Sequence, residues 1–134
     1  TYPVKGAYVF LDACFSGGYK SAAPLIAQKG VRVVPKLGMP QGNTISFSSS
    51  SGDQTSSVYH DKKQGYYTYF LLKTIKDAHG DITMQQLFER TNAEVKKATA
   101  LLGKMQEPQY IVSPTWKTWS SIQLKTPETV NTAQ

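Results

Sequence analysis

Three short runs in the first half of the chain have the hydrophobic pattern of β-strands. Residues 7–11 form an unbroken apolar run, which is typical of a strand covered on both faces in a parallel sheet. Residues 31–34 and 43–48 are two further strand candidates, short and rich in β-branched or aromatic side chains. Residues 35–42, which are rich in Pro and Gly, and the polar residues 49–64 are expected to be loops.

The second half of the chain has the periodicity of two amphipathic helices. Residues 65–78 are expected to form the first, which Gly80 ends in a left-handed conformation. Thr83, with Gln86 three residues later, has the pattern of a capping box and predicts a second helix that ends at Gly103. The expected core face of the first helix consists of Tyr67, Phe70, Leu71, Thr74 and Ala78, widened by Leu72 and Ile75. That of the second consists of Met84, Leu87, Phe88, Val95, Ala98 and Leu102.

The remaining C-terminal residues complete an α/β pattern. Residues 110–112 are expected to be extended, Pro114 interrupts them, and residues 116–124 are expected to form a last strand. Strands that alternate with helices predict an open, mostly parallel sheet flanked by helices, formed by residues 1–125 as a single domain. Residues 126–134 form a polar tail.

Composition and charge exclude several classes of protein. The chain has 134 residues, a length that suits one domain or part of one, and its single cysteine excludes an internal disulfide framework and a cysteine-rich zinc site. No apolar run approaches the roughly 18 residues that span a bilayer, and the first residues lack the pattern of a signal peptide. The net charge is +6, but the lysines are scattered over expected helix faces, so neither a nucleic acid nor a membrane is expected as partner.

Polar and reactive residues follow two of the expected strands. Asp12, Cys14 and two glycines come directly after residues 7–11, and Asp53 lies in the polar loop after residues 43–48. Ligand sites in open α/β sheets lie beyond the carboxyl ends of the strands. A lone cysteine is more often a small buried hydrophobe than a reactive group. If the two strands are neighbours, however, Asp12 and Asp53 converge beside Cys14 and form a pocket for a cation, for which guanidinium is the best match.

Residues 9–18, which read Val-Phe-Leu-Asp-Ala-Cys-Phe-Ser-Gly-Gly, resemble the nucleophile segment of the caspase-like cysteine peptidases of family C14. The similarity is to the metacaspase and bacterial caspase-homologue branch, since true caspases have glutamine at the position of Asp12. Residues 51–56 resemble the second characteristic segment of the family. Residues 65–72 and 80–87 resemble the starts of the two helices that follow it. The resemblance therefore covers the C-terminal part of a catalytic domain.

This resemblance implies roles for three residues. Cys14 would be the nucleophile, and its backbone N–H would contribute to the oxyanion hole. Asp12 would line the S1 pocket and favour cleavage after Arg or Lys, and Asp53 is a weaker candidate for the same pocket. Phe15 stands where histidine is commoner in the family. The acidic cluster of calcium-dependent members is absent from residues 21–23 (Ser-Ala-Ala), so no metal and no other cofactor are expected.

The resemblance also implies that the catalytic histidine lies outside this chain. In the family it precedes the cysteine by about 50 residues, whereas only 13 residues precede Cys14. His60 and His79, a loop residue and a helix-end residue, are interpreted as surface residues. An N-terminal segment of the same domain, either a processed partner chain or the upstream part of a longer protein, is expected to supply the histidine.

The function expected from the sequence is that of a cysteine endopeptidase with a Cys–His dyad, which acts on peptides or proteins after basic residues. A caspase-like pseudo-enzyme that serves as an interaction module is the main alternative, and a basic nucleic-acid-binding α/β domain is a third. A nucleotide-binding domain is disfavoured because no phosphate-binding glycine motif follows a strand. A functional thiol suits a reducing compartment such as the cytoplasm, although an export signal could lie in an upstream segment.

Overall fold

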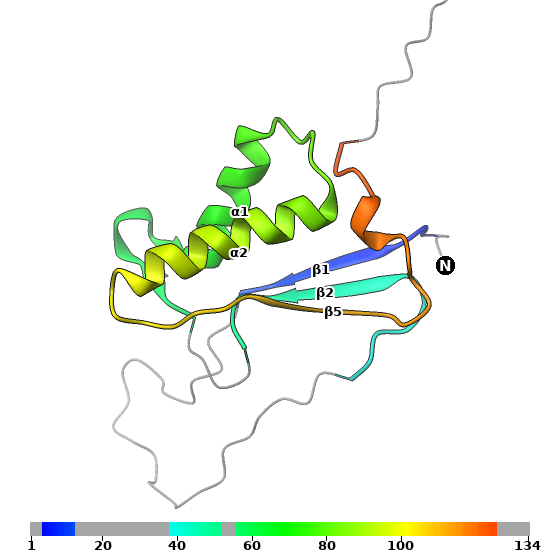
Figure 1. Ribbon diagram of the computed structural model, residues 1–134, viewed down its shortest axis with the longest axis horizontal. Coiled ribbons are helices and arrows are strands. Elements are labelled where there is room, and N and C mark those ends of the chain that lie inside the picture. Colours follow the sequence, from blue (N-terminus) through cyan, green and yellow to red (C-terminus); the bar gives the residue numbers. More distant parts are fainter. Residues whose placement is uncertain (1–3, 13–37, 52–55, 126–134) are drawn as a thin grey trace, which may run out of the picture.

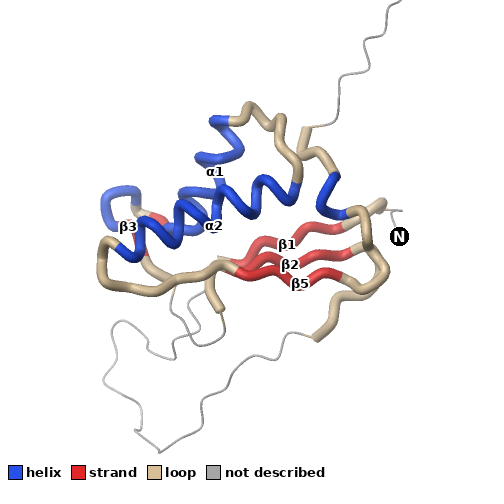
Figure 2. Tube along the Cα trace, viewed as in Figure 1, coloured by secondary structure: helices blue, strands red, loops and turns tan. Residues whose placement is uncertain are grey.

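The computed structural model describes residues 4–12, 38–51 and 56–125 of the chain. In chain order the elements are β1 (Ala7–Leu11), β2 (Thr44–Ser48), β3 (Val58–Tyr59), the 3-10 helix η1 (His60–Lys62), β4 (Gln64–Gly65), α1 (Tyr66–Asp77), α2 (Met84–Ala100), β5 (Gln109–Val112) and the 3-10 helix η2 (Trp119–Ser121). The described helices all lie on the same side of the sheet formed by β1, β2 and β5 (Figures 1 and 2). The mixed α/β class predicted from the sequence is confirmed.

The sheet has the strand order β1-β2-β5. β1 and β2 are parallel, in register from the pair Ala7 and Thr44 to the pair Leu11 and Ser48. β5 is antiparallel to β2, so the described part of the sheet combines one parallel and one antiparallel pairing rather than being mostly parallel. The strands expected over residues 7–11, 43–48 and 110–112 are confirmed within one residue at each end. The expected strand 31–34 and the tail 126–134 lie outside the described residues.

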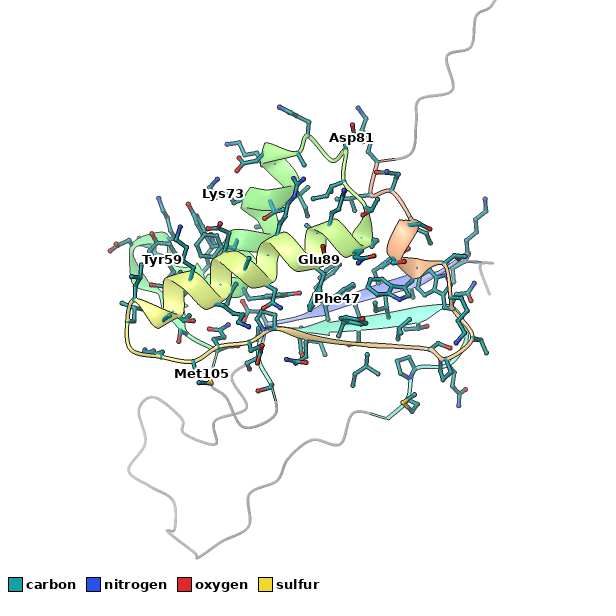
Figure 3. All side chains as sticks on the ribbon, in the orientation of Figure 1. Phe47, Tyr59, Lys73, Asp81, Glu89 and Met105 are labelled. Carbon is teal, nitrogen blue, oxygen red and sulfur yellow. The ribbon has the colours of Figure 1, made fainter. Side chains whose placement is uncertain are left out.

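The hydrophobic core lies between this sheet and α2. Phe47 is 1 % exposed and points toward α2 (Figure 3), and the parallel register places Phe10 beside it with ring centroids 4.9 Å apart. Phe88 of α2 and Trp119 of η2 cover Phe47 from the helical side, at 5.9 and 6.2 Å. The buried hydrophobic residues are Ile45, Phe47, Tyr66, Tyr67, Ile82, Met84, Leu87, Val95 and Trp116.

β1 is more exposed than its unbroken apolar run predicts. Val9 is 39 % and Phe10 37 % exposed, and among the described residues β1 pairs along one edge only, with β2. Phe10 stacks on Phe47 on the side of the sheet that carries the described helices (Figure 2). Because side chains alternate along a strand, the neighbouring Val9 faces the opposite side of the sheet. The expectation of a strand covered on both faces is therefore not met by the described part of the chain.

The two predicted helices are present, and their ends follow local rules. The left-handed conformation that ends α1 begins at His79, with φ +51°, and continues at Gly80, with φ +76°, so the expected stop lies one residue earlier than predicted. Thr83 and Gln86 form the predicted capping box at the start of α2, with hydrogen bonds of 3.2 and 3.1 Å. α2 ends at Ala100 rather than at Gly103, which has φ +65° in the turn that follows. No helix in the described part of the chain combines the length and the apolar character needed to cross a bilayer.

Two residues assigned to the helical core faces are instead exposed. Leu72 on α1 is 54 % exposed, because it lies at the margin of the apolar stripe rather than at its centre. Leu102 is 52 % exposed, because it follows the last residue of α2 and no longer shares that helix's core face.

Two loop and strand assignments were wrong. Residues 49–64, expected to be a loop, include the short antiparallel pair β3 and β4, since Lys63 has φ +54° at the turn and Tyr59 stacks on Tyr66 at 4.6 Å. Residues 116–124 were expected to form a strand but contain η2 and a single isolated bridge between Thr83 and Gln123. Trp116 packs on Tyr8 of β1, and Trp119 packs on Phe47 of β2. Their spacing of three residues matches a helical turn better than the two-residue period of a strand.

Candidate active site

Asp12 lies at the carboxyl edge of the sheet and is the one sequence-predicted site residue within the described part of the chain. Cys14 and Asp53 lie outside the described residues. Asp12 follows β1 directly, and Ser49 follows β2 at the same edge, where its backbone N–H donates to the carbonyl of Leu11 at 2.9 Å. The ends of the two strands are therefore neighbours, which is the condition that the sequence analysis set for a shared site.

Asp12 caps a helix that lies 56 residues away along the chain. Its exposed carboxylate accepts hydrogen bonds through Oδ2 from the backbone N–H of Thr68 at 3.2 Å and from the Thr68 hydroxyl at 2.5 Å. Thr68 is the third residue of α1, and Gly65, at the N-cap position, offers no side chain to this helix. A carboxylate at a helix N-terminus satisfies an unpaired N–H and interacts favourably with the helix dipole. Asp12 thus supplies from the sheet the cap that α1 lacks locally.

The absence of a side chain at Gly65 makes this contact possible. A Cβ atom built on Gly65 would overlap the Asp12 carboxylate, with Oδ2 as its nearest neighbour. The backbone of Gly65 is in the ordinary extended region, with φ −68°, so its conformation does not require glycine. We conclude that glycine is needed here for the close approach of Asp12.

Gln106 holds together the two ends of the polar loop that contains Asp53. Its side chain is 1 % exposed, its Nε2 donates to the carbonyl of Ser49 at 2.9 Å, and its Oε1 accepts from the N–H of Ser57 at 2.8 Å. The hydroxyls of Ser49 and Ser56 are also hydrogen-bonded to each other. One buried amide therefore pairs two main-chain groups that would otherwise be left unsatisfied.

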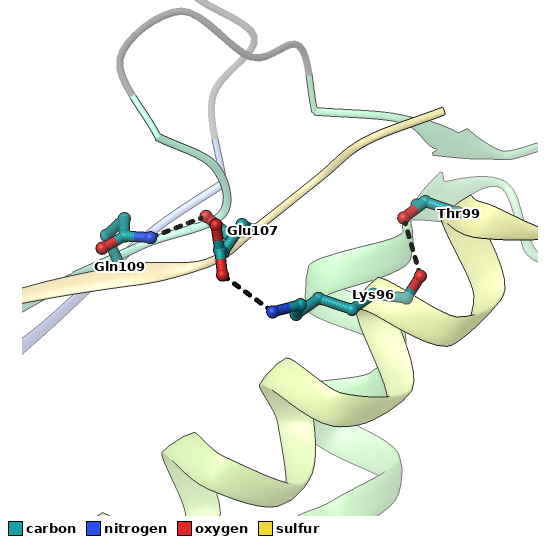
Figure 4. Close-up of polar contacts among 4 residues, drawn as sticks. All are labelled: Lys96, Thr99, Glu107 and Gln109. Atoms are coloured by element: carbon teal, nitrogen blue, oxygen red, sulfur yellow. Dashed lines mark hydrogen bonds and ion pairs between the residues drawn. The ribbon is translucent and has the colours of Figure 1, made fainter. Parts of the chain in front are cut away.

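The segment that carries Gln106 is also tied to α2. Lys96 Nζ forms an ion pair with Glu107 Oε1 at 2.8 Å, and Gln109 Nε2 donates to the Glu107 carbonyl at 3.4 Å (Figure 4). Both charged side chains of this ion pair are about half exposed, 52 % and 41 %, so solvent screens it. The buried amide of Gln106, rather than the ion pair, is the stronger link at this point.

These hydrogen bonds, together with the short stretches of backbone between them, form a closed ring that we call the edge circuit. It passes from β1 to β2, through Gln106 to the segment before α1, and returns through the first turn of α1 to the residue after β1. The members in order are Leu11, Ser49, Gln106, Ser57, Tyr66, Thr68 and Asp12. Within the edge circuit Asp12, two places before Cys14, is held by the hydrogen bonds from Thr68 and by its own place after β1.

A buried tyrosine lies beneath this edge. Tyr67 is 2 % exposed, and burial, with a smaller effect from the negative charge of Asp12, raises the pKa of its phenol above the ordinary value. The phenol is therefore neutral over the physiological range, and its ring packs in the hydrophobic core.

The described histidine and acidic residues do not form a metal-binding site. His79 is exposed in the turn after α1, with φ +51°, in agreement with its interpretation as a surface residue. His60 lies in η1. Within residues 4–12, 38–51 and 56–125, no group of three or more His, Cys, Asp or Glu side chains could hold a metal ion.

A sequence model of the caspase domain matches residues 3–118 of the chain, nearly its whole length. The chain belongs to the caspase-domain family. Family C14 consists of cysteine peptidases, so the resemblance seen in the nucleophile segment is confirmed at the level of the family. A comparison of this caspase domain with curated proteins gave no match.

The match to the caspase domain includes the whole edge circuit as well as Cys14 and Asp53. Sequence reasoning identified Asp12 but missed Thr68 and Gln106. The start of α1 gave one signal, because a helix that begins after glycine without a Ser, Thr, Asp or Asn cap must take its cap from elsewhere. Gln106 stands between Met105 and Glu107 in an irregular segment, and nothing in the local pattern marks it as buried.

Proposed function

We propose that this caspase domain is a cysteine endopeptidase of the metacaspase and bacterial caspase-homologue branch, and that it cleaves peptide bonds after Arg or Lys. The single observation that supports basic specificity most directly is the placement of Asp12. Its carboxylate is exposed at the carboxyl edge of the sheet, is held in one orientation by Thr68, and lies two residues before Cys14. An exposed and oriented carboxylate suits recognition of a cationic side chain.

In the proposed reaction the Cys14 thiol transfers its proton to a histidine, and the thiolate attacks the carbonyl carbon of the scissile bond. The negative charge that develops on the carbonyl oxygen is stabilised by backbone N–H groups, among them that of Cys14. The protonated histidine then donates its proton to the leaving amine, which gives an acyl-enzyme. Water, deprotonated by the same histidine, hydrolyses the thioester and restores the thiol. Asp12, with Asp53 as a second carboxylate, would bind the basic side chain that precedes the scissile bond.

The histidine is proposed to come from an N-terminal segment of the same peptidase domain. The edge of β1 supports this proposal, because within the described residues it pairs only with β2 and leaves Val9 and Phe10 partly exposed. An unpaired strand edge presents a row of free N–H and C=O groups to which a further strand can add. A strand added there would lie beside Asp12 and could carry the base to the same edge.

The nucleophile is tested by Cys14→Ala in the full-length protein, assayed on peptide reporters that end in Arg, Lys or Asp before the leaving group. Loss of all cleavage is expected, with unchanged thermal stability as the control for folding. Undiminished turnover by Cys14→Ala would refute the proposal. A wild-type protein that cleaves none of the three reporters would instead favour the pseudo-enzyme that acts as an interaction module.

The specificity group is tested by Asp12→Asn, because the amide keeps an oxygen that can cap α1 while it removes the negative charge. Cleavage after Arg and Lys should fall by about 100-fold, as expected when a charge pair that the bound substrate covers loses one partner. Gly65→Ala provides the matched structural variant, because it displaces the carboxylate without removing its charge. Full activity of Asp12→Asn on basic reporters would show that another group selects the substrate.

A further inference from the structure

Both hydrogen bonds that Thr68 donates to Asp12 end on the same carboxylate oxygen. The backbone N–H and the hydroxyl of Thr68 are 3.2 and 2.5 Å from Oδ2, and among the described residues no hydrogen bond reaches Oδ1. A carboxylate oxygen has two lone pairs, so these two donors use the acceptor capacity of Oδ2. Oδ1 is the oxygen that remains available to a ligand.

This asymmetry bears on how a basic side chain can bind. The strong, side-on pairing of guanidinium with a carboxylate uses two parallel N–H donors, one to each oxygen. With Oδ2 occupied, a cation can reach only Oδ1 without displacing Thr68. A single acceptor serves the ammonium of lysine as well as it serves one N–H of arginine, so the usual advantage of arginine is lost.

We propose that Thr68 is a positioning residue that sets the specificity of Asp12: it occupies Oδ2, presents Oδ1, and thereby lets the enzyme accept Lys nearly as well as Arg. This inference rests on the proposed function. It deepens that function by assigning the balance between the two basic substrates to a residue that contacts Asp12 and not the substrate.

The surroundings of Thr68 favour a fixed arrangement. Its N–H belongs to the first turn of α1, where it has no partner inside the helix, and the carboxylate satisfies it whether or not a substrate is present. The neighbouring Tyr67, 2 % exposed, anchors this turn in the core, and the missing side chain at Gly65 leaves the space that the carboxylate fills. Oδ2 is therefore committed to the helix before a substrate arrives.

The test compares Thr68→Val, which has the shape of threonine without its hydroxyl, with Thr68→Ser, which keeps the hydroxyl. Both are measured in the full-length protein on Arg and Lys reporters of otherwise identical sequence, with kcat and KM determined separately. In Thr68→Val one lone pair of Oδ2 becomes free for a second guanidinium N–H, so the Arg-to-Lys ratio of kcat/KM should rise about tenfold, mainly through KM. Thr68→Ser should keep the wild-type ratio.

A purely structural role for Thr68 would lower cleavage of both reporters equally and leave their ratio unchanged, and that result in Thr68→Val would overturn the inference. A wild-type enzyme that already strongly prefers Arg over Lys would overturn it too. If Thr68→Val fails to fold, Thr68→Ala removes the same hydroxyl and gives the same expected ratio. Absence of any Cys14-dependent cleavage after basic residues would refute the proposed function itself, an outcome distinct from an active wild type with an unchanged ratio.

Discussion

The core beneath α2 and the edge circuit are held together by different forces. Around Phe47 the contacts are aromatic and aliphatic, and the residues involved are recognisable from their spacing along each strand and helix. At the carboxyl edge a few polar side chains hold the segments together by hydrogen bonds, and their partners lie 49 to 57 residues away along the chain. The core therefore depends on volume and burial, whereas the edge depends on the identity of single hydrogen-bonding groups.

This difference has a consequence for substitution. A hydrophobic core tolerates a change of shape if most of the volume is kept. A buried hydrogen bond cannot be replaced by an apolar group of the same size, because its partners remain unpaired. The two regions should therefore respond in opposite ways to substitutions that conserve volume.

The largest effect is expected for Phe47→Ala. The ring is 1 % exposed and contacts aromatic rings from β1, α2, β5 and η2. Its removal should lower the free energy of unfolding by about 3–5 kcal/mol, measured by chemical denaturation. Phe47→Leu, which keeps much of the volume, should recover more than half of that loss. Equal losses for the two variants would show that this core is not governed by volume.

Gln106→Met should cost about 2–4 kcal/mol, because the N–H of Ser57 and the carbonyl of Ser49 both lose a buried partner. Like Phe47→Leu, this variant keeps most of the side-chain volume. Unlike Phe47→Leu, it should not recover the lost free energy of unfolding. Gln109→Met, at an exposed glutamine three residues along, is the matched control and should change the stability by less than about 0.5 kcal/mol. A neutral Gln106→Met would remove the distinction between the two regions.

Tyr67 joins the two regions, since it is buried in the core and lies close to the charge of Asp12. Because folding raises the pKa of its phenol, the neutral form is favoured in the native state, and its contribution is complete below the unfolded pKa of about 10. Above that pH the unfolded chain ionises more readily, so the free energy of unfolding should fall by about 1.4 kcal/mol per pH unit on account of this group. Tyr67→Phe should lessen that slope between pH 10 and 11; an identical slope in both proteins would contradict the prediction.

Lys96→Met should have the smallest effect, below about 0.5 kcal/mol, because the ion pair with Glu107 is half exposed and screened. This variant tests whether the Lys96–Glu107 ion pair stabilises the protein in addition to the buried amide of Gln106. If Lys96→Met instead lowered the free energy of unfolding nearly as much as Gln106→Met, and the loss depended on salt, then charge rather than the buried amide would stabilise this edge.

The core and the edge circuit also differ in how much of each could be predicted from the sequence. The strands at residues 7–11 and 43–48 and the helix after Thr83 were predicted because periodicity and capping are local properties. η2 was not predicted, since its Trp119 packs on a sheet surface that only the tertiary fold creates. Asp12 was singled out by its place after a strand, but its partner Thr68 depends on how α1 approaches the sheet. Nothing local marked Gln106, because its burial results from three separate segments that meet around it.

The cap that Asp12 provides from the sheet makes the Thr68 amide a natural spectroscopic sensor. Its N–H is bonded to the carboxylate that stands two residues before the proposed nucleophile, so a ligand that pulls Asp12 away would release that proton to solvent. Exchange of this single amide would then distinguish a ligand that displaces the carboxylate from Thr68 from a ligand that binds Oδ1 alone, even in an inactive Cys14 variant.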